Sequence, residues 1–343
     1  MKKFFVIFAL VALVASPAMA ADWNFYGSAR MSTFSADVDP GGNAESDQDT
    51  TWGLQGNSRI GANVKAGDVT GRFEYGSGPN LRILWGEWNF GSGSLGVGQH
   101  YTPLNFFPSN QVFDGDADLL PYGGIYRGRR PMIQLKWGTF KLAFISPTGA
   151  SDLGSTGDVD ITWPQVEMSY QFKTDMFYTD IFGGWQSYDI DDAPEAAVNV
   201  SIDSYVIGLN AGVTFGPATV KASIWRGQNM GPYGFWLTGD ANPGLNDART
   251  ETLDNDSTGF LGVVTFKATD MLSFEVGYGA LKHDRENNDN DDETQSMYAN
   301  AVITMAPGVF IVPEIGKVDY EQNFAGQEEG DTTYFGAKWQ INF

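Results

Sequence analysis

Apolar and polar residues alternate along several segments of this chain, so that every second side chain belongs to the same chemical class. Near the C-terminus, Phe335 and Trp339 alternate with Lys338 and Gln340. A period of two places the two classes on opposite faces of a β-strand, whereas a helix would group them at spacings of three and four. The same alternation is present over residues 51–66, 204–215 and 332–343.

Short and long connectors alternate between the predicted strands. Short turns are expected at 66–68, 91–94, 137–139, 173–176, 216–218, 269–271 and 306–308. Longer loops are expected at 35–50, 100–126, 147–160, 188–199, 227–256, 283–293 and 320–331, with 77–80 as a short exception. Seven turns and eight loops separate sixteen strands, and an even count places both chain ends at the same rim.

A sheet with one apolar and one polar face requires hydrocarbon on one side and water on the other. Open edges in lipid would leave backbone donors and acceptors unpaired, at several kcal/mol each, so such a sheet closes on itself. We therefore predict an all-β fold: a transmembrane antiparallel β-barrel of about sixteen strands, with short periplasmic turns and longer external loops. A soluble β-helix or sandwich is the alternative, but it would not require the asymmetry between turns and loops.

The N-terminus has the features of a secretory signal peptide. Lys2 and Lys3 precede an apolar run over residues 4–15, and a small-x-small pattern ends at Ala20. A membrane anchor is the alternative, although the run is short. We expect residues 1–20 to be removed and residues 21–343 to form a single barrel domain.

Composition excludes several functions. The formal net charge of −21 argues against a nucleic-acid partner, and the absence of cysteine excludes disulfides and thiolate chemistry. Only His100 and His283 could serve as a histidine base, and they lie in different loops, which argues against a hydrolase. The G-x-G-x-x-G at residues 91–96 lies between predicted strands, so we interpret it as a tight turn.

Three segments resemble a known family. The last strand carries aromatic or aliphatic residues at alternate positions and ends in phenylalanine, which resembles the assembly signal of outer-membrane barrels: Trp339, Ile341 and Phe343. Residues 58–61 and residues 81–104 resemble the trimeric general porins of Gram-negative bacteria. The resemblance implies a homotrimer in the outer membrane, in contact with lipid and lipopolysaccharide and inserted by the barrel assembly machinery.

The resemblance also implies that the third loop, about residues 100–126, folds into the barrel and narrows it. Its acidic residues are then expected at the constriction: Asp114, Asp116 and Asp118. By parity with their apolar neighbours, five arginines are expected to form a basic pore wall: Arg30, Arg59, Arg72, Arg82 and Arg130. Arg82 and Glu87 differ in parity, so this strand requires a bulge or an early end if both avoid lipid. Arg127 and Arg129 have the opposite parity to Arg130 and belong to the loop.

These features predict an outer-membrane porin: a water-filled channel for passive diffusion of ions and small hydrophilic solutes, and not an enzyme. We expect weak cation preference, because carboxylates concentrate in the external loops. A substrate-selective porin with a luminal binding site is one alternative, and an outer-membrane enzyme or adhesive barrel is another. No cofactor is expected. We interpret the acidic run 284–293 as a solvated loop, with weak binding of divalent cations as the alternative.

Overall fold

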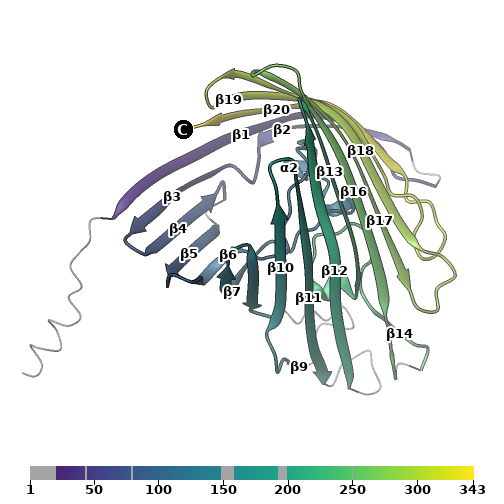
Figure 1. Ribbon diagram of the computed structural model, residues 1–343. Helices are drawn as coiled ribbons and strands as arrows, with labels where there is room; N and C mark the ends of the chain where they lie inside the picture. Colours follow the sequence, from purple (N-terminus) through teal and green to yellow (C-terminus); the bar gives the residue numbers. More distant parts are fainter. Residues whose placement is uncertain (1–20, 43–44, 79, 148–157, 192–198, 249) are drawn as a thin grey trace, which may run out of the picture.

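The computed structural model describes residues 21–42, 45–78, 80–147, 158–191, 199–248 and 250–343. These residues form one antiparallel sheet that closes into a barrel (Figure 1). The first half of the sheet comprises β1 (Asp22–Asp39), β2 (Asp47–Leu54), β3 (Arg59–Ala66), β4 (Val69–Gly76), β5 (Leu81–Asn89), β6 (Ser94–Tyr101), β7 (Arg129–Trp137), β8 (Phe140–Ile145), β9 (Asp158–Asp160) and β10 (Gln165–Lys173). The second half comprises β11 (Phe177–Asp191), β12 (Val200–Phe215), β13 (Ala218–Gln228), β16 (Asn255–Lys267), β17 (Leu272–Arg285), β18 (Asp292–Ala306), β19 (Val309–Asp319) and β20 (Asp331–Asn342).

These eighteen segments form sixteen barrel strands, as the sequence predicts. β2 and β3 both pair with β1 and together make one strand, while β9 and β10 both pair with β11 and make another. β1 also pairs with β20, from Ser28 opposite Asn342 to Asp39 opposite Asp331, which closes the barrel. The backbones of Gly27 and Phe343 add two hydrogen bonds of 2.6 and 3.0 Å at the rim where both ends lie.

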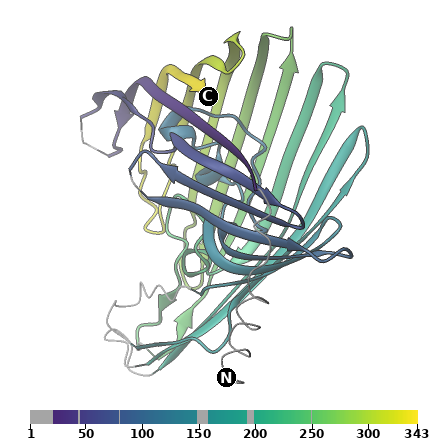
Figure 2. The same ribbon diagram turned by 90° about the vertical axis from the view of Figure 1, so that its left-hand side faces the viewer.

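All seven short turns lie where the sequence predicts them, and the strands extend further into the predicted loops. The wall is uneven in height: β3 to β8 have six to nine residues each, whereas β11 to β13 and β16 to β20 have eleven to sixteen. We call β3 to β8 the short wall, and we call the barrel strands β11 to β13 and β16 to β20 the tall wall. The strands are tilted, and the short wall stands opposite much longer strands (Figure 2).

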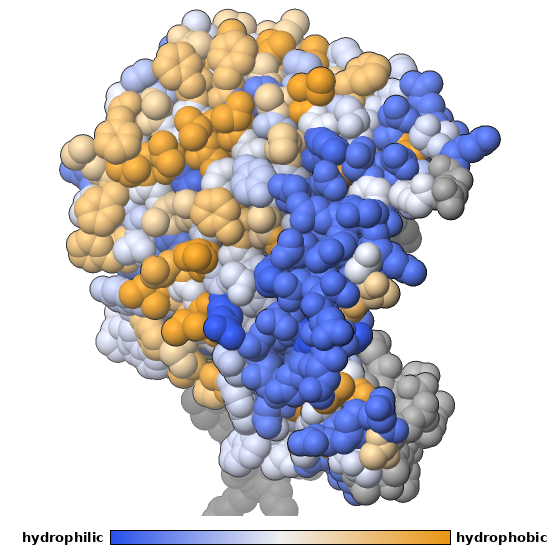
Figure 3. Space-filling view, turned by 90° about the vertical axis from the view of Figure 1, so that its right-hand side faces the viewer, coloured by the Kyte–Doolittle hydropathy of each residue, from blue (hydrophilic) through white to orange (hydrophobic). Residues whose placement is uncertain are grey.

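The outer face of the barrel is apolar. Side chains of one parity are exposed and hydrophobic all around it, among them Leu84, Ile133, Ile181, Ile207, Ile224, Val276, Met297, Ile315 and Phe335. Hydrophobic residues cover a broad area on one side of the molecule, and hydrophilic residues gather in a separate band (Figure 3). In the described part of the chain, no helix has the length and apolar character needed to cross a membrane.

Two loops fold into the barrel and pack against its tall wall. The third loop joins β6 to β7 (residues 102–128) and contains α2 (Phe113–Asp116) and the 3-10 helix η1 (Leu120–Tyr122). The sixth loop joins β13 to β16 (residues 229–254) and contains α3 (Met230–Tyr233) and a hairpin of β14 (Gly244–Leu245) and β15 (Thr252–Leu253).

The hydrophobic core lies between these two loops and the tall wall. Val112, Leu119 and Tyr122 of the third loop pack with Leu261 and Tyr334 of the wall. A second cluster joins the third and sixth loops to the wall: Leu104, Ile125, Phe182, Val206, Trp225, Met230, Tyr233, Phe235, Ala241 and Leu281. These contacts hold both loops against the tall wall inside the barrel.

Candidate pore constriction

The third loop is anchored by three buried glutamates of the barrel wall. Glu275 of β17 accepts hydrogen bonds from the backbone and side-chain nitrogens of Asn110, at 2.7 and 2.8 Å. Glu314 of β19 accepts from the backbone N–H groups of Val112 and Phe113, at 2.8 and 2.9 Å. Glu167 of β10 accepts from the N–H of Leu104 at 3.1 Å. These bonds satisfy loop donors that would otherwise be buried without partners.

The third loop is also anchored at Gly123, where its backbone lies close to the backbones of β16 and β17. Its φ is +106°, and a Cβ built there would lie 2.3 Å from the Phe260 carbonyl oxygen and 2.4 Å from that of Ala280. The indole N–H of Trp225 donates to the Gly123 carbonyl at 3.0 Å. Only glycine combines this backbone conformation with so close an approach to β16 and β17.

The third loop narrows the lumen to a cavity of about 550 Å³, which we call the eyelet. The third loop supplies one side, β1, β20 and the short wall supply the other, and the sixth loop contributes Trp236. The charged residues that line it are Arg30, Arg59, Arg82, Arg129, Lys338, Asp116 and Asp118. Five basic residues thus face two acidic ones.

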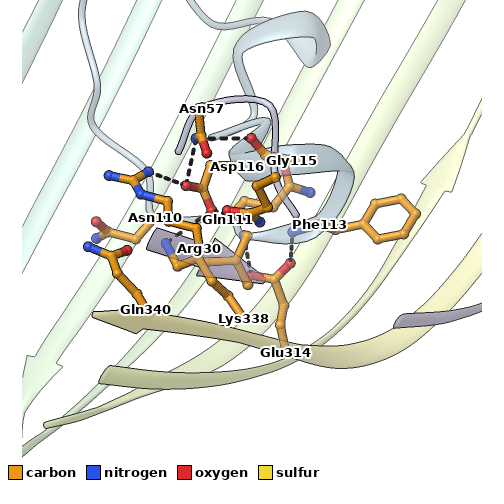
Figure 4. Close-up of polar contacts among 12 residues, drawn as sticks. Arg30, Asn57, Asn110, Gln111, Phe113, Gly115, Asp116, Glu314, Lys338 and Gln340 are labelled. Carbon is orange, nitrogen blue, oxygen red and sulfur yellow. Dashed lines mark hydrogen bonds and ion pairs between the residues drawn. The ribbon is translucent and has the colours of Figure 1, made fainter. Parts of the chain in front are cut away.

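Asp116 joins the third loop to the basic side of the eyelet. Its carboxylate lies 2.5 Å from Nη1 of Arg30 and 3.0 Å from Nζ of Lys338. Nδ2 of Asn57 donates to the same carboxylate at 2.8 Å (Figure 4). Burial acts to raise the pKa of Asp116, but Lys338 and Arg30 outweigh it and the pKa is lowered. Asp116 therefore stays ionised at neutral pH.

The other two predicted acidic residues lie differently. Asp118 lines the eyelet, but burial and the neighbouring Asp116 raise its pKa well above the usual range. Asp114 is exposed and does not line the eyelet. Burial raises the pKa values of Tyr122 and Tyr320, and the nearby Asp114 adds to this effect. Asp114, Asp116 and Asp118 all adopt positive φ angles, between 49° and 66°, which are uncommon for residues other than glycine.

Glu74 of β4 organises the arginines. This carboxylate is completely buried and lies 2.7 Å from Nε of Arg82, 2.9 Å from Nη2 of Arg72 and 3.8 Å from Nη1 of Arg59. The Tyr26 hydroxyl donates to it at 2.8 Å. One carboxylate is shared among three guanidinium groups, so the cluster keeps net positive charge. Glu74 was not among the predicted pore residues, although it shares the inward parity of Arg72.

The five predicted wall arginines are divided by the structure. Arg30, Arg59 and Arg82 line the eyelet, and Arg72 lines an adjoining cavity of about 430 Å³ together with Glu87 and Lys136. Neither of these two cavities includes Arg130. The register between β4 and β5 shifts at Tyr75, and this bulge lets Arg82 and Glu87 both face the lumen.

Residues beyond the predicted set also line the eyelet. Arg129 lines the eyelet, although its parity is opposite to that of the inward-facing residues of β7. It is the first residue of this strand, next to the third loop. Lys338 was predicted only as a polar residue of an alternating strand. Arg127 is buried and hydrogen-bonds the Gln165 side chain at 2.9 Å, and burial lowers its pKa to about 10. The inward fold of the sixth loop had no recognisable signal in the sequence.

The predicted assembly residues lie on the outer face of the closing strand. Trp339, Ile341 and Phe343 are all exposed there. Trp339 donates from its indole nitrogen to the Thr33 hydroxyl at 2.9 Å. The Phe343 ring occupies the space in which Gly27 would carry a Cβ. The C-terminus thus takes part in barrel closure.

The acidic run 284–293 lies at one end of β17 and β18. Asp291 and Glu293 pair with Lys282, and Asp292 accepts from the Asp240 backbone. Over the described ranges, no group of three or more His, Cys, Asp or Glu residues is arranged to hold a metal ion. His283 is buried and contacts the Ser257 hydroxyl at 2.8 Å and the Thr238 carbonyl at 2.9 Å, which ties the sixth loop to the wall.

Comparison with known proteins agrees with this architecture. Comparison with the curated proteins finds no match, whereas the family described as "Gram-negative porin" matches residues 8–323. Among solved structures, the outer-membrane channel DcaP of Acinetobacter baumannii has a TM-score of 0.75 at 14% identity, over 94% of this chain and 97% of its own. The anion-selective porin of Comamonas acidovorans has a TM-score of 0.62 at 11% identity, over 94% and 100%. OmpT of Vibrio cholerae, in a trimer form, has a TM-score of 0.62 at 15% identity, over 94% and 100%. The chain belongs to the Gram-negative porin family and forms a β-barrel channel of the outer membrane.

Proposed function

We propose that this porin carries small hydrophilic solutes by passive diffusion and favours anions over cations. The observation that carries the proposal is the charge of the eyelet, where five basic residues face Asp116 and Asp118. The raised pKa of Asp118 favours its uncharged form, which further reduces the negative charge of the eyelet. This preference for anions is opposite to the weak cation preference expected from the acidic external loops.

The distance of each charged group from the permeating solute decides whether the eyelet or the external loops control the selectivity. At physiological salt, charges separated by more than about 8 Å are largely screened from each other. A solute in the eyelet touches Arg30, Arg59 and Arg129 directly, whereas an acidic residue in an external loop acts through salt solution. A narrow gap between low-dielectric walls also concentrates the field of the charges that line it. The local cations therefore dominate the selectivity.

Conductance in different salts tests this proposal. Replacing potassium by the less mobile lithium ion slows only the cation, and replacing chloride by acetate slows only the anion. We expect single-channel conductance to fall more in potassium acetate than in lithium chloride. A larger fall in lithium chloride would contradict the proposal.

We also propose that the protein is a homotrimer, inserted by the barrel assembly machinery. The outer face beside the short wall carries exposed aromatic residues, including Trp23, Phe25, Tyr75 and Trp88, which can pack against neighbouring copies. Unheated electrophoresis with chemical cross-linking should show a trimer. Phe343→Ala should lower the amount of protein in the outer membrane while assembled channels conduct normally. Unchanged membrane levels would show that Phe343 only packs against lipid.

A further inference from the structure

Four aromatic rings form a continuous row inside the eyelet. Phe107 lies 5.5 Å from Tyr101 and 5.9 Å from Tyr126 between ring centroids. Tyr126 lies 5.9 Å from Trp236, the residue contributed by the sixth loop. All four rings line the eyelet, and Phe107 and Trp236 keep 47% and 40% of their surfaces exposed.

This row is held in place and still exposed to the lumen. The backbone N–H of Trp236 donates to the Tyr126 carbonyl at 3.0 Å, which ties the sixth loop to the third. Apolar surface in a water-filled channel is unfavourable unless something covers it during function. The other aromatic residues of the two inward loops are buried or partly buried, so the exposure of Phe107 and Trp236 sets them apart.

Guanidinium groups lie at one end of the row. Nη1 of Arg129 donates to the Tyr101 hydroxyl at 2.8 Å, and the Arg129 guanidinium carbon lies 5.1 Å from the Tyr101 ring centroid. Nη2 of Arg82 approaches the same hydroxyl at 3.4 Å. Within the described ranges, no carboxylate lies within 4 Å of the Arg129 guanidinium. Arg129 therefore keeps donors for a ligand.

We propose that the eyelet is a recognition site for small planar aromatic carboxylates. Arg129 provides the paired donors that match a carboxylate, and Phe107 and Trp236 provide faces for an aromatic ring. Aliphatic anions would gain only the contact with the cations, and neutral aromatic solutes only the contact with the rings. The inference rests on the proposed anion preference and names the class of anion that the eyelet retains longest.

Block of the ion current by benzoate tests the inference on the full-length protein in planar bilayers. We expect benzoate to interrupt the potassium chloride current in a saturable manner. Cyclohexanecarboxylate, which has the same charge but no flat ring, and benzamide, which has the ring but no charge, should each require about tenfold higher concentrations. Equal block by benzoate and cyclohexanecarboxylate would overturn the inference.

Variants assign the block to the aromatic row. Trp236→Ala should raise the half-blocking concentration of benzoate and remove the difference from cyclohexanecarboxylate. Trp236→Phe keeps an aromatic ring, so it should preserve both the half-blocking concentration of benzoate and the difference from cyclohexanecarboxylate. This variant controls for misfolding. Trp163→Ala provides the matched control, because Trp163 is exposed but does not line the eyelet. Retained discrimination in Trp236→Ala would overturn the inference.

The selectivity of the same channels separates this inference from the proposed function. Zero-current potentials of the unmodified protein and of the control variant Trp163→Ala, measured without benzoate, report the preference between chloride and potassium independently of the block. A channel that prefers chloride but does not distinguish the two carboxylates overturns the inference alone. A channel that prefers potassium overturns the proposed function, and the carboxylate comparison is then judged separately.

Discussion

Nη1 of Arg30 lies 2.5 Å from the Asp116 carboxylate, although 86 positions separate the two residues in the chain. The contact joins the first barrel strand to the tip of the third loop across the lumen. It therefore ties the third loop to the barrel wall and places a positive and a negative charge together in the lining of the eyelet.

Removing the carboxylate of Asp116 should strengthen the preference for anions. Asp116→Asn leaves Arg30 and Lys338 without their acidic partner, and we expect the chloride-to-potassium permeability ratio to rise roughly twofold to threefold. Zero-current potentials in a salt gradient measure the ratio. Asp114→Asn is the matched control, since Asp114 is exposed and does not line the eyelet. Equal effects of both substitutions would contradict the assignment of Asp116.

Removing a cation from the eyelet should have the opposite effect. Arg59→Gln deletes a guanidinium that lines the eyelet, and its 3.8 Å separation from Glu74 is the longest of the three in that cluster. The permeability ratio should shift toward potassium by a similar factor of roughly two to three. Arg130→Gln changes the same charge at a residue that does not line the eyelet, and should change selectivity less. A larger shift in Arg130→Gln than in Arg59→Gln would contradict the finding that Arg59 lines the eyelet and Arg130 does not.

Acidification should increase anion preference through Asp118. Its raised pKa means that the carboxyl takes up a proton as the pH falls, while Asp116, with its lowered pKa, remains charged. The eyelet thus loses one negative charge and gains net positive charge as the pH falls, at pH values above the range in which ordinary carboxylates titrate. Asp118→Asn should flatten this change. An unchanged pH profile in the variant would exclude Asp118 as the responsible group.

Gly123 should be required for docking of the third loop. Gly123→Ala introduces a Cβ against two wall carbonyl oxygens and a residue that disfavours positive φ, at a cost of about 1 to 3 kcal/mol. We expect a loosened loop, seen as faster proteolysis of the third loop and a wider spread of single-channel conductance. Gly53→Ala is the control, because nothing lies within 4 Å of the added Cβ. Wild-type behaviour of Gly123→Ala would show that the loop tolerates the displacement.

The barrel was predictable because its local rules appear in the sequence. Period-two alternation and the short turns gave the strand number, and the differing parity of Arg82 and Glu87 indicated the bulge in β5. The contents of the lumen were less predictable, because they depend on contacts between distant segments. Asp114 is exposed outside the eyelet whereas Asp116 lines it, and sequence spacing cannot show this difference. Lys338 and Trp236 reach the same cavity from other strands and loops.

The sign of ion selectivity tests the central claim most directly. The zero-current potential is measured for the unmodified protein at neutral pH, with potassium chloride about tenfold more concentrated on one side. We expect the sign that corresponds to chloride as the more permeant ion, and it should persist at high salt because the eyelet charges are in contact with the ion. A potential of the opposite sign at high salt would show that Arg30, Arg59, Arg82, Arg129 and Lys338 do not control the passage of ions.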